Sequence, residues 1–172
     1  VVRPAAITGP CIAGELARRV ETAVVLAGRD AATLGRLADL MRAPGYHVAA
    51  STDVVGAEAC AALKNGYAMG VGFAAGIHEA RGGAPGSVAM HNYEAAVFAQ
   101  SILEMSTLVR VMGGDPASVA GLPGVGDLNV TCNGGRTGRF GRWLGLGLPL
   151  AEAIEKMQGA TLECLDVLRV LR

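Results

Sequence analysis

The sequence predicts a short α/β region, the end of an open sheet, followed by a region made of helices. Runs rich in Val, Ile and Thr recur within the first fifty residues, with a helical pattern between two of them. From residue 53 onward, helical patterns of small apolar residues continue nearly to residue 172. Only 17% of the residues are charged and 51% are hydrophobic, which indicates a large interior. We therefore divide the chain into residues 1–52 and 53–172.

Three strands are expected in the first region, at residues 5–8, 22–27 and, more weakly, 46–51. Asp30 can cap a helix between the last two strands, and Pro44 and Gly45 would end it. The apolar residues of this helix recur at helical spacing: Leu34, Leu37, Ala38 and Met41. About fifty residues are too few for a whole doubly wound domain, so this region is predicted to be the end of one.

Two long helices are expected in the second region, at residues 56–77 and 92–113. Shorter helices follow at residues 116–121, after Gly138, at 150–157 and at 161–171. Most glycines fall in the loops between these helices. The predicted architecture is thus a remnant of a sheet followed by an all-α domain.

The charges exclude several classes of function. Fifteen Lys and Arg residues balance fifteen Asp and Glu residues and are scattered, so the basic surface of a nucleic-acid-binding protein is absent from the sequence. The four cysteines form no CxxC pair, which favours a reduced, cytoplasmic setting. The histidines have no ligand spacing with cysteines or carboxylates, so no metal site is predicted. A small molecule is the expected partner, with neither nucleic acid nor membrane.

Lys64 interrupts a helix of small apolar residues and is one of only two lysines. Burial disfavours a charged amine, so a lysine persists in such a place where an anion or a reaction uses it. The alternative is a lysine that extends from the helix edge into water. A membrane-spanning helix is a further alternative, because Gly66, Gly70, Gly72 and Gly76 have small-xxx-small spacing. Lys64 and Asn65 within the span argue against it.

Two other segments carry polar groups suited to a ligand. Asp127 and Thr131 are four residues apart and face the same way if the segment is helical. The run Gly134-Gly135-Arg136-Thr137 offers backbone N–H groups and a guanidinium at the start of a helix, which suits a phosphate or carboxylate. An ordinary glycine-rich loop with a solvated arginine is the alternative.

The turn after the first strand, residues 8–13, is expected at a sheet edge of the kind where ligands bind. A plain turn between a strand and a helix is the alternative. Cys11 has no acid–base partner nearby in the sequence, so it is not predicted to be a nucleophile. None of the glycine clusters forms a G-x-G-x-x-G run directly after a strand. The chain also begins with Val rather than Met, and we expect it to be part of a longer protein.

Four motifs follow one another along the chain: TGPCIA (8–13), DVVGAEACAALKN (53–65), GDLNVTC (126–132) and GRTGRFG (135–141). In this order and spacing they resemble the motifs of the NAD(P)-dependent glycerol-3-phosphate dehydrogenases. The resemblance implies the last strands of a Rossmann-type domain, then a helical domain of the 6-phosphogluconate dehydrogenase C-terminal-like fold. It implies NAD or NADP as cofactor, with the nucleotide loop upstream, and a cytoplasmic enzyme that supplies glycerophospholipid precursors. Whether the protein is a homodimer stays open, as does the preference between NAD and NADP.

The resemblance also implies a role for individual residues. Lys64 would be the acid–base residue that gives a proton to the ketone oxygen of dihydroxyacetone phosphate. Asp127 would contact the substrate and Lys64, with support from Thr131, and Arg136 would bind the phosphate and lie close to the dinucleotide. The substrate-binding residues would be Gly9, Cys11, Lys64, Asn65, Asp127, Thr131, Gly135, Arg136 and Thr137, and the cofactor-binding residues Ala13, Arg136 and Glu163.

Three residues depart from the family pattern. Cys11 stands where Ser or Thr is usual, Thr137 where Asn is usual, and Gly66 where a β-branched residue is usual. Two alternatives stay open. One is a dehydrogenase of the 3-hydroxyacid type, in which the Asn would follow the Lys by several residues. The other is a non-catalytic helical module or degenerate homologue. The isolated chain is expected to be inactive because most cofactor contacts would lie upstream.

Overall fold

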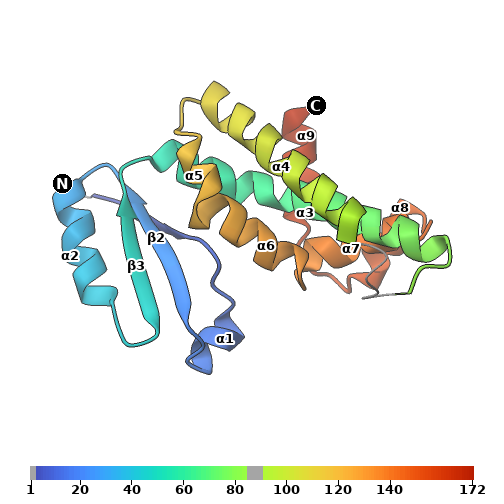
Figure 1. Ribbon diagram of the computed structural model, residues 1–172, viewed down its shortest axis with the longest axis horizontal. Helices are drawn as coiled ribbons and strands as arrows, with labels where there is room; N and C mark the ends of the chain where they lie inside the picture. The colour runs from blue at the N-terminus through green and yellow to red at the C-terminus, as the bar shows by residue number, and fades with distance from the viewer. Residues whose placement is uncertain (1–2, 85–90) are drawn as a thin grey trace. The chain divides into compact units, whose positions relative to one another are not determined.

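The computed structural model describes residues 3–84 and 91–172 (Figure 1). The chain packs as two compact units. The first unit consists of Val1–Ala61 and Glu104–Asp127, and the second of Ala62–Leu103 and Leu128–Arg172. Two long helices, α3 (Val54–Ala80) and α4 (His91–Val111), contribute residues to both units. The predicted domain boundary between residues 52 and 53 stays a prediction.

The first unit contains a three-stranded sheet in the order β1-β2-β3 (Figure 1). The strands are β1 (Ala5–Thr8), β2 (Thr22–Gly28) and β3 (Tyr46–Ser51), so all three predicted strands are confirmed. Strand β3 is parallel to β2, whereas β1 is antiparallel to it. Helix α2 (Ala31–Met41) makes the crossover that a parallel pair needs. The connection from β1 to β2 holds only the short α1 (Ala13–Ala17), which buries no residue.

Helix α2 packs on the face of β2 and β3, and the predicted apolar spacing of this helix is confirmed. Leu34 and Ala38 are buried and form one core cluster with Val24, Leu26 and Val48. Half-buried side chains surround this cluster: Leu37, Met41 and Tyr46. A helix with one apolar stripe covers a sheet face in this way because both surfaces leave water together.

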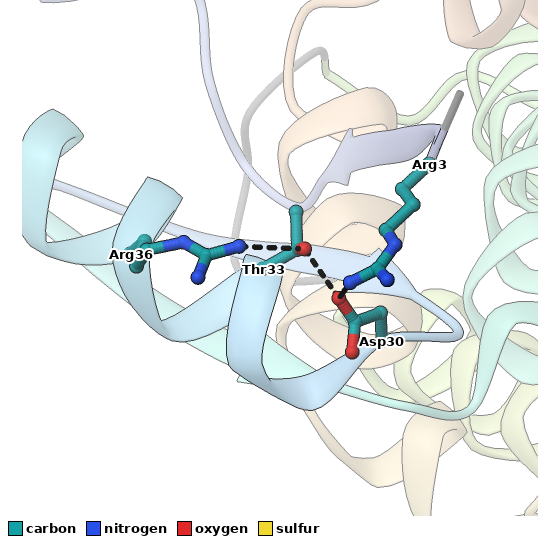
Figure 2. A network of polar contacts seen from close by, with 4 residues as sticks. All are labelled: Arg3, Asp30, Thr33 and Arg36. Atoms are coloured by element: carbon teal, nitrogen blue, oxygen red, sulfur yellow. Dashed lines mark hydrogen bonds and ion pairs between the residues drawn. The ribbon is translucent and has the colours of Figure 1, made fainter. Parts of the chain in front are cut away.

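Asp30 occupies the N-cap position of α2, as predicted, but its side chain makes no capping hydrogen bond and instead forms a network with three other side chains (Figure 2). The Asp30 carboxylate accepts hydrogen bonds from the Thr33 hydroxyl and the Arg3 guanidinium. Arg36 Nη2 in turn donates to Thr33 Oγ1 over 3.2 Å. The hydrogen bond from Thr33, and then that from Arg3, lower the pKa of Asp30. The network therefore ties Arg3, two residues before β1, to the start of α2.

Most of the remaining chain is helical, as predicted. The first unit adds α5 (Ala117–Ala120) and a π-helical turn, η2 (Leu122–Gly126). Helix α6 (Asp127–Cys132) follows at once, and then come α7 (Arg136–Gly145), α8 (Leu150–Lys156) and α9 (Glu163–Leu171). The core of the second unit combines α7, α8 and α9 through four buried side chains: Phe140, Ala153, Met157 and Cys164. The π-helical turn has no counterpart in the prediction.

Glycines bring α7 into backbone contact with α3 in the second unit. A Cβ added at Gly72 would overlap the carbonyl oxygen of Gly138, and one added at Gly76 would lie 2.8 Å from the Cα of Gly145. A Cβ at Gly141 would likewise overlap the carbonyl of Met69. These glycines thus serve close packing between two helices of the same unit. Among the described residues, no helix is long and apolar enough to cross a membrane.

An ion pair joins the same two helices beyond the glycine contacts. Arg142 Nε donates to Glu79 Oε1 over 2.5 Å, and its Nη2 donates to Oε2 over 2.7 Å. The Glu79 side chain is only 11% exposed. The hydrogen bond from Arg142 lowers the pKa of Glu79 despite this burial. A bidentate pair of this kind fixes direction as well as distance, so α7 is held against α3 by both backbone and side chains.

Candidate functional site

The turn after β1 lies against the segment that leads into α6, all within the first unit. Gly9 has φ +120°, a conformation that only glycine adopts without strain. A Cβ added at Gly126 would lie 3.3 Å from Cδ of Pro10. Since Gly126 directly precedes Asp127, the structure brings two of the four predicted motifs together: the Gly9–Cys11 turn and the start of the Asp127 motif.

Asp127 is 6% exposed and begins α6 immediately after the π-helical turn. Such turns occur frequently at functional sites. Burial raises the pKa of the Cys60 thiol to about 11, and the negative charges of Asp53 and Asp127 add to this effect. The negative charge of Asp127 thus contributes to the raised pKa of Cys60, a residue of α3. Cys60 precedes Lys64 by four residues, so the two side chains leave the same face of that helix.

Lys64 and Asn65 are both half-buried on α3. The residue that follows them, Gly66, faces α9, because a Cβ at this position would lie 3.5 Å from Cγ1 of Val167. This distance is an ordinary van der Waals contact, so nothing in the structure explains the glycine where the family pattern has a β-branched residue. Val167 lies one turn after Glu163, so α9 connects the Lys64 segment with a predicted cofactor residue.

Arg136 and Glu163 form an ion pair in the second unit. Arg136 Nη2 donates to Glu163 Oε1 over 3.0 Å. The two residues are the first of α7 and of α9, respectively. Their side chains are 51% and 41% exposed, so the pair is open to a ligand from solvent. Two residues that the sequence analysis assigned to cofactor contact are therefore neighbours in space.

The residues that flank Arg136 are fixed by the preceding helix. Gly135 donates its backbone N–H to the carbonyl of Thr131 over 3.1 Å, and a Cβ at Gly135 would overlap that oxygen. Thr131 is half-buried on α6, whose helical geometry gives it the same face as Asp127, as predicted. Thr137 is only 2% exposed. A ligand at this turn would thus meet the guanidinium of Arg136 and the backbone of α7.

Cys11 and Ala13 are exposed at the start of α1. The other three cysteines are poor nucleophiles: burial raises the pKa of Cys132 to about 12 and also raises those of Cys60 and Cys164. The buried hydroxyl of Thr8 has no hydrogen-bond partner within the described part of the chain. Sequence reasoning missed this hydroxyl because a threonine at the end of a strand is ordinary. Across residues 3–84 and 91–172, no group of His, Cys, Asp and Glu is suited to a metal ion.

Two cavities differ in their relation to these residues. One of about 860 Å³ in the first unit is lined by Arg3, Arg29 and Glu58 among others and contains none of the predicted site residues. A smaller one of about 170 Å³ in the second unit is lined by Gly135, Arg139, Glu94 and Cys132 among others, and of these Gly135 is a predicted site residue. Cavity size alone therefore does not locate the predicted site.

Comparison with known proteins places these residues in one family. Residues 53–172 match the family described as NAD-dependent glycerol-3-phosphate dehydrogenase C-terminus. The NADP(+)-dependent glycerol-3-phosphate dehydrogenase of Archaeoglobus fulgidus is 36% identical over 156 residues, which are 91% of this chain and 45% of that protein. The glycerol-3-phosphate dehydrogenase [NAD(P)+] of Geobacter metallireducens is 40% identical over 154 residues, 88% of this chain and 43% of that protein.

Solved structures agree with this result. Glycerol-3-phosphate dehydrogenase from Coxiella burnetii superposes with a TM-score of 0.84 at 32% identity, covering 99% of this chain and 51% of that one. The yeast enzyme gives a TM-score of 0.78 at 25% identity, covering 92% and 46%. The chain thus spans about half the length of the relatives it matches. It belongs to the NAD-dependent glycerol-3-phosphate dehydrogenase family and corresponds to the C-terminal part of its members.

Proposed function

We propose that the complete protein interconverts sn-glycerol 3-phosphate and dihydroxyacetone phosphate with NAD(H) or NADP(H), in the supply of glycerophospholipid precursors. The observation that carries this proposal is the family match over residues 53–172, which includes Lys64, Asp127 and Arg136. The curated relatives are dehydrogenases of glycerol 3-phosphate that use NAD(P). No observation in the structure favours a 3-hydroxyacid dehydrogenase or a non-catalytic module.

Arg136 is proposed to bind the substrate phosphate. Its guanidinium is half-exposed and uses one of its five N–H groups for Glu163, which leaves the others for phosphate oxygens. It stands at the N-terminus of α7, where free backbone N–H groups favour an anion. Because the Thr137 side chain is buried, the contact proposed for this residue runs through its backbone N–H. Gly9 and Cys11 are proposed to touch the substrate from the β1 turn.

Lys64 is proposed to move the proton at the substrate oxygen. When bound, the nicotinamide cofactor supplies a hydride to the ketone carbon, and the Lys64 ammonium gives a proton to the ketone oxygen, so the carbonyl becomes an alcohol. In the reverse direction the amine accepts that proton. Asp127 is proposed to contact both the substrate and Lys64. The family match over residues 53–172 includes both residues and supports this assignment.

The residues proposed for cofactor contact carry groups that are suited to a dinucleotide. Ala13 is exposed, and Arg136 and Glu163 present half-exposed polar groups at the first residues of two helices. A guanidinium and a carboxylate are the groups that bind the phosphates and the ribose hydroxyls of a dinucleotide. Asn65, Thr131 and Gly135 are proposed as further substrate contacts beside these residues.

Binding of glycerol 3-phosphate tests the role of Arg136. Isothermal titration of the complete protein should show at least a tenfold loss of affinity in Arg136→Ala, because a charged hydrogen-bonding partner of the phosphate is removed. Arg169→Ala is the control, since Arg169 is an exposed arginine of the second unit that pairs with Asp166. Equal affinity in Arg136→Ala and in the unmodified protein would exclude the proposed phosphate site.

Turnover tests the role of Lys64. In the complete protein, Lys64→Ala should lower kcat for reduction of dihydroxyacetone phosphate by at least a hundredfold, as expected for loss of a general acid. Lys156→Ala changes the other lysine, which lies 4.9 Å from the centre of the Trp143 ring, and should leave kcat nearly unchanged. Undiminished turnover in Lys64→Ala would refute the mechanism.

We also propose a cytoplasmic setting. All four cysteines are unpaired thiols, which is typical of proteins in a reducing compartment. Fractionation of cells followed by detection of the protein would test this, and recovery of the protein with a membrane or periplasmic fraction would contradict it.

A further inference from the structure

We propose that Glu163 is a positioning residue that orients the guanidinium of Arg136 for the substrate phosphate, an inference that rests on the function proposed above. From the family resemblance, Glu163 is expected only to contact the cofactor. In the structure its carboxylate instead lies 3.0 Å from Arg136 Nη2. The two roles make different predictions, because a positioning residue acts through Arg136 and a cofactor contact does not.

The geometry of the pair leaves Arg136 able to bind an anion. A single hydrogen bond, from Nη2 to Oε1, joins the two side chains. The guanidinium has five N–H donors in a rigid plane, so fixing one edge sets the direction of the others. A monodentate partner therefore orients the group and still leaves a free edge for a bidentate phosphate contact.

The charges of the two helix ends explain why Arg136 needs this partner. Arg136 is the first residue of α7, where the partial positive charge of the helix end repels a cation. Glu163 is the first residue of α9, where a carboxylate is favoured. Without Glu163 the half-exposed arginine would extend into water and sample many rotamers, and phosphate binding would then have to order it.

The backbone that carries Glu163 is fixed relative to α7. Cys164, the next residue, is fully buried in the cluster that contains Phe140 of α7. One turn later Val167 faces Gly66 of α3. The carboxylate is thus presented from a packed helix and not from a loop, which is what holding a flexible arginine in one direction requires.

Two measurements on matched variants test the proposal. The first is the dissociation constant of glycerol 3-phosphate for the complete protein without cofactor, which should rise five- to tenfold in Glu163→Ala, less in Glu163→Gln, and least in Glu163→Asp. In an Arg136→Ala background, Glu163→Ala should cause no further change. The second is the NMR signal of Arg136 Nε, which should show increased side-chain mobility in Glu163→Ala. Asp166→Ala, on the same helix and exposed, is the control.

The outcomes separate the two proposals. If Arg136→Ala binds glycerol 3-phosphate as tightly as the unmodified protein, the proposed function fails. If Arg136→Ala weakens binding but Glu163→Ala does not, only the positioning role is overturned. The positioning role is also overturned if Glu163→Ala lowers the affinity for glycerol 3-phosphate equally in the unmodified protein and in the Arg136→Ala background. It is overturned as well if Glu163→Ala leaves the Arg136 Nε signal unchanged. Glu163→Gln replaces Glu163→Ala in every comparison if the alanine variant does not fold.

Discussion

The residues proposed for ligand contact are held in two different ways. Arg136 stands on α7, whose backbone touches that of α3 at Gly72 and whose Arg142 forms a bidentate ion pair with Glu79. Cys11 and Ala13 stand at the start of α1, a helix that buries no residue. Its apolar side chains are exposed, Leu16 by 39%. Arg136 is therefore held by two helices that pack on each other, whereas Ala13 stands on a helix with no buried side chain.

Gly72→Ala tests the helix contact most directly and should have the largest effect. The added Cβ would overlap the carbonyl of Gly138, and neither backbone can move without distorting its helix. We expect a loss of about 3 kcal/mol in the free energy of unfolding, measured by urea denaturation. Gly70→Ala is the matched control, because no atom lies within 4 Å of its added Cβ, and it should stabilise the chain by up to about 1 kcal/mol. Equal effects at the two positions would refute the backbone contact.

Asp53→Ala tests the hydrogen bonds that hold the start of α3 in the first unit. We expect the free energy of unfolding to fall by about 2 kcal/mol. The Asp53 carboxylate accepts hydrogen bonds from the Gly56 N–H at 2.9 Å, the Asp115 N–H at 3.0 Å and the Ser118 hydroxyl at 2.6 Å. Burial opposes ionisation, but these hydrogen bonds outweigh it and lower the pKa of Asp53. Urea denaturation measures this loss. Asp39→Ala, which removes an exposed aspartate, is the control measured beside it.

The lowered pKa of Asp53 also sets the direction of a pH effect. Its contribution is fully present above the unfolded-state pKa of about 3.9 and is lost as pH falls through the lower folded-state value. The difference in stability between the unmodified chain and Asp53→Ala should therefore shrink below about pH 4. A difference that stays constant down to pH 2 would contradict the assignment.

Glu79→Ala tests the ion pair with Arg142 and should lower the free energy of unfolding by about 1.5 kcal/mol. Glu79 is nearly buried, but Arg142 is 37% exposed, so solvent screens part of the interaction. Because Arg142 lowers the pKa of Glu79, this contribution is present above the unfolded-state pKa of about 4.3 and is lost as pH falls through the lower folded-state value. Urea denaturation at pH 7 and pH 3 measures both effects. An unchanged cost at pH 3 would show that the loss comes from packing and not from charge.

Leu16→Ala should have the smallest effect, less than about 0.5 kcal/mol, because the side chain packs against little in α1. Thermal unfolding of the variant beside the unmodified chain measures it. A loss above about 1 kcal/mol would mean that α1 is anchored as firmly as α7, and the contrast between the two regions would disappear.

The sequence predicted the elements well where hydrophobic spacing decides them. Strands β1 and β3 have the expected bounds, and β2 extends one residue further, to Gly28. The expected helix at 150–157 corresponds to α8 (Leu150–Lys156). Each of these elements buries one of its faces, so the hydrophobic spacing in the sequence matches the burial in the structure.

The errors arise where glycine serves packing rather than turns. We expected a helix after Gly138, but α7 begins at Arg136, because Gly138 and Gly141 pack against α3 and do not interrupt the helix. The π-helical turn before Asp127 was not predicted either, since its backbone follows from contacts such as that of Gly124 with Val119. Arg136 and Glu163 are 27 residues apart in the sequence, so no local spacing predicts their ion pair.

The uneven burial of the four thiols has a practical consequence. Cys11 is exposed, whereas Cys60 and Cys164 are buried and Cys132 is partly buried with a pKa raised to about 12. A maleimide dye added at neutral pH should attach to Cys11 first, without any cysteine having to be removed. The chain therefore carries an attachment point for a fluorophore two residues beyond Gly9. A change in its emission on addition of glycerol 3-phosphate would test the proposed contact between this turn and the substrate.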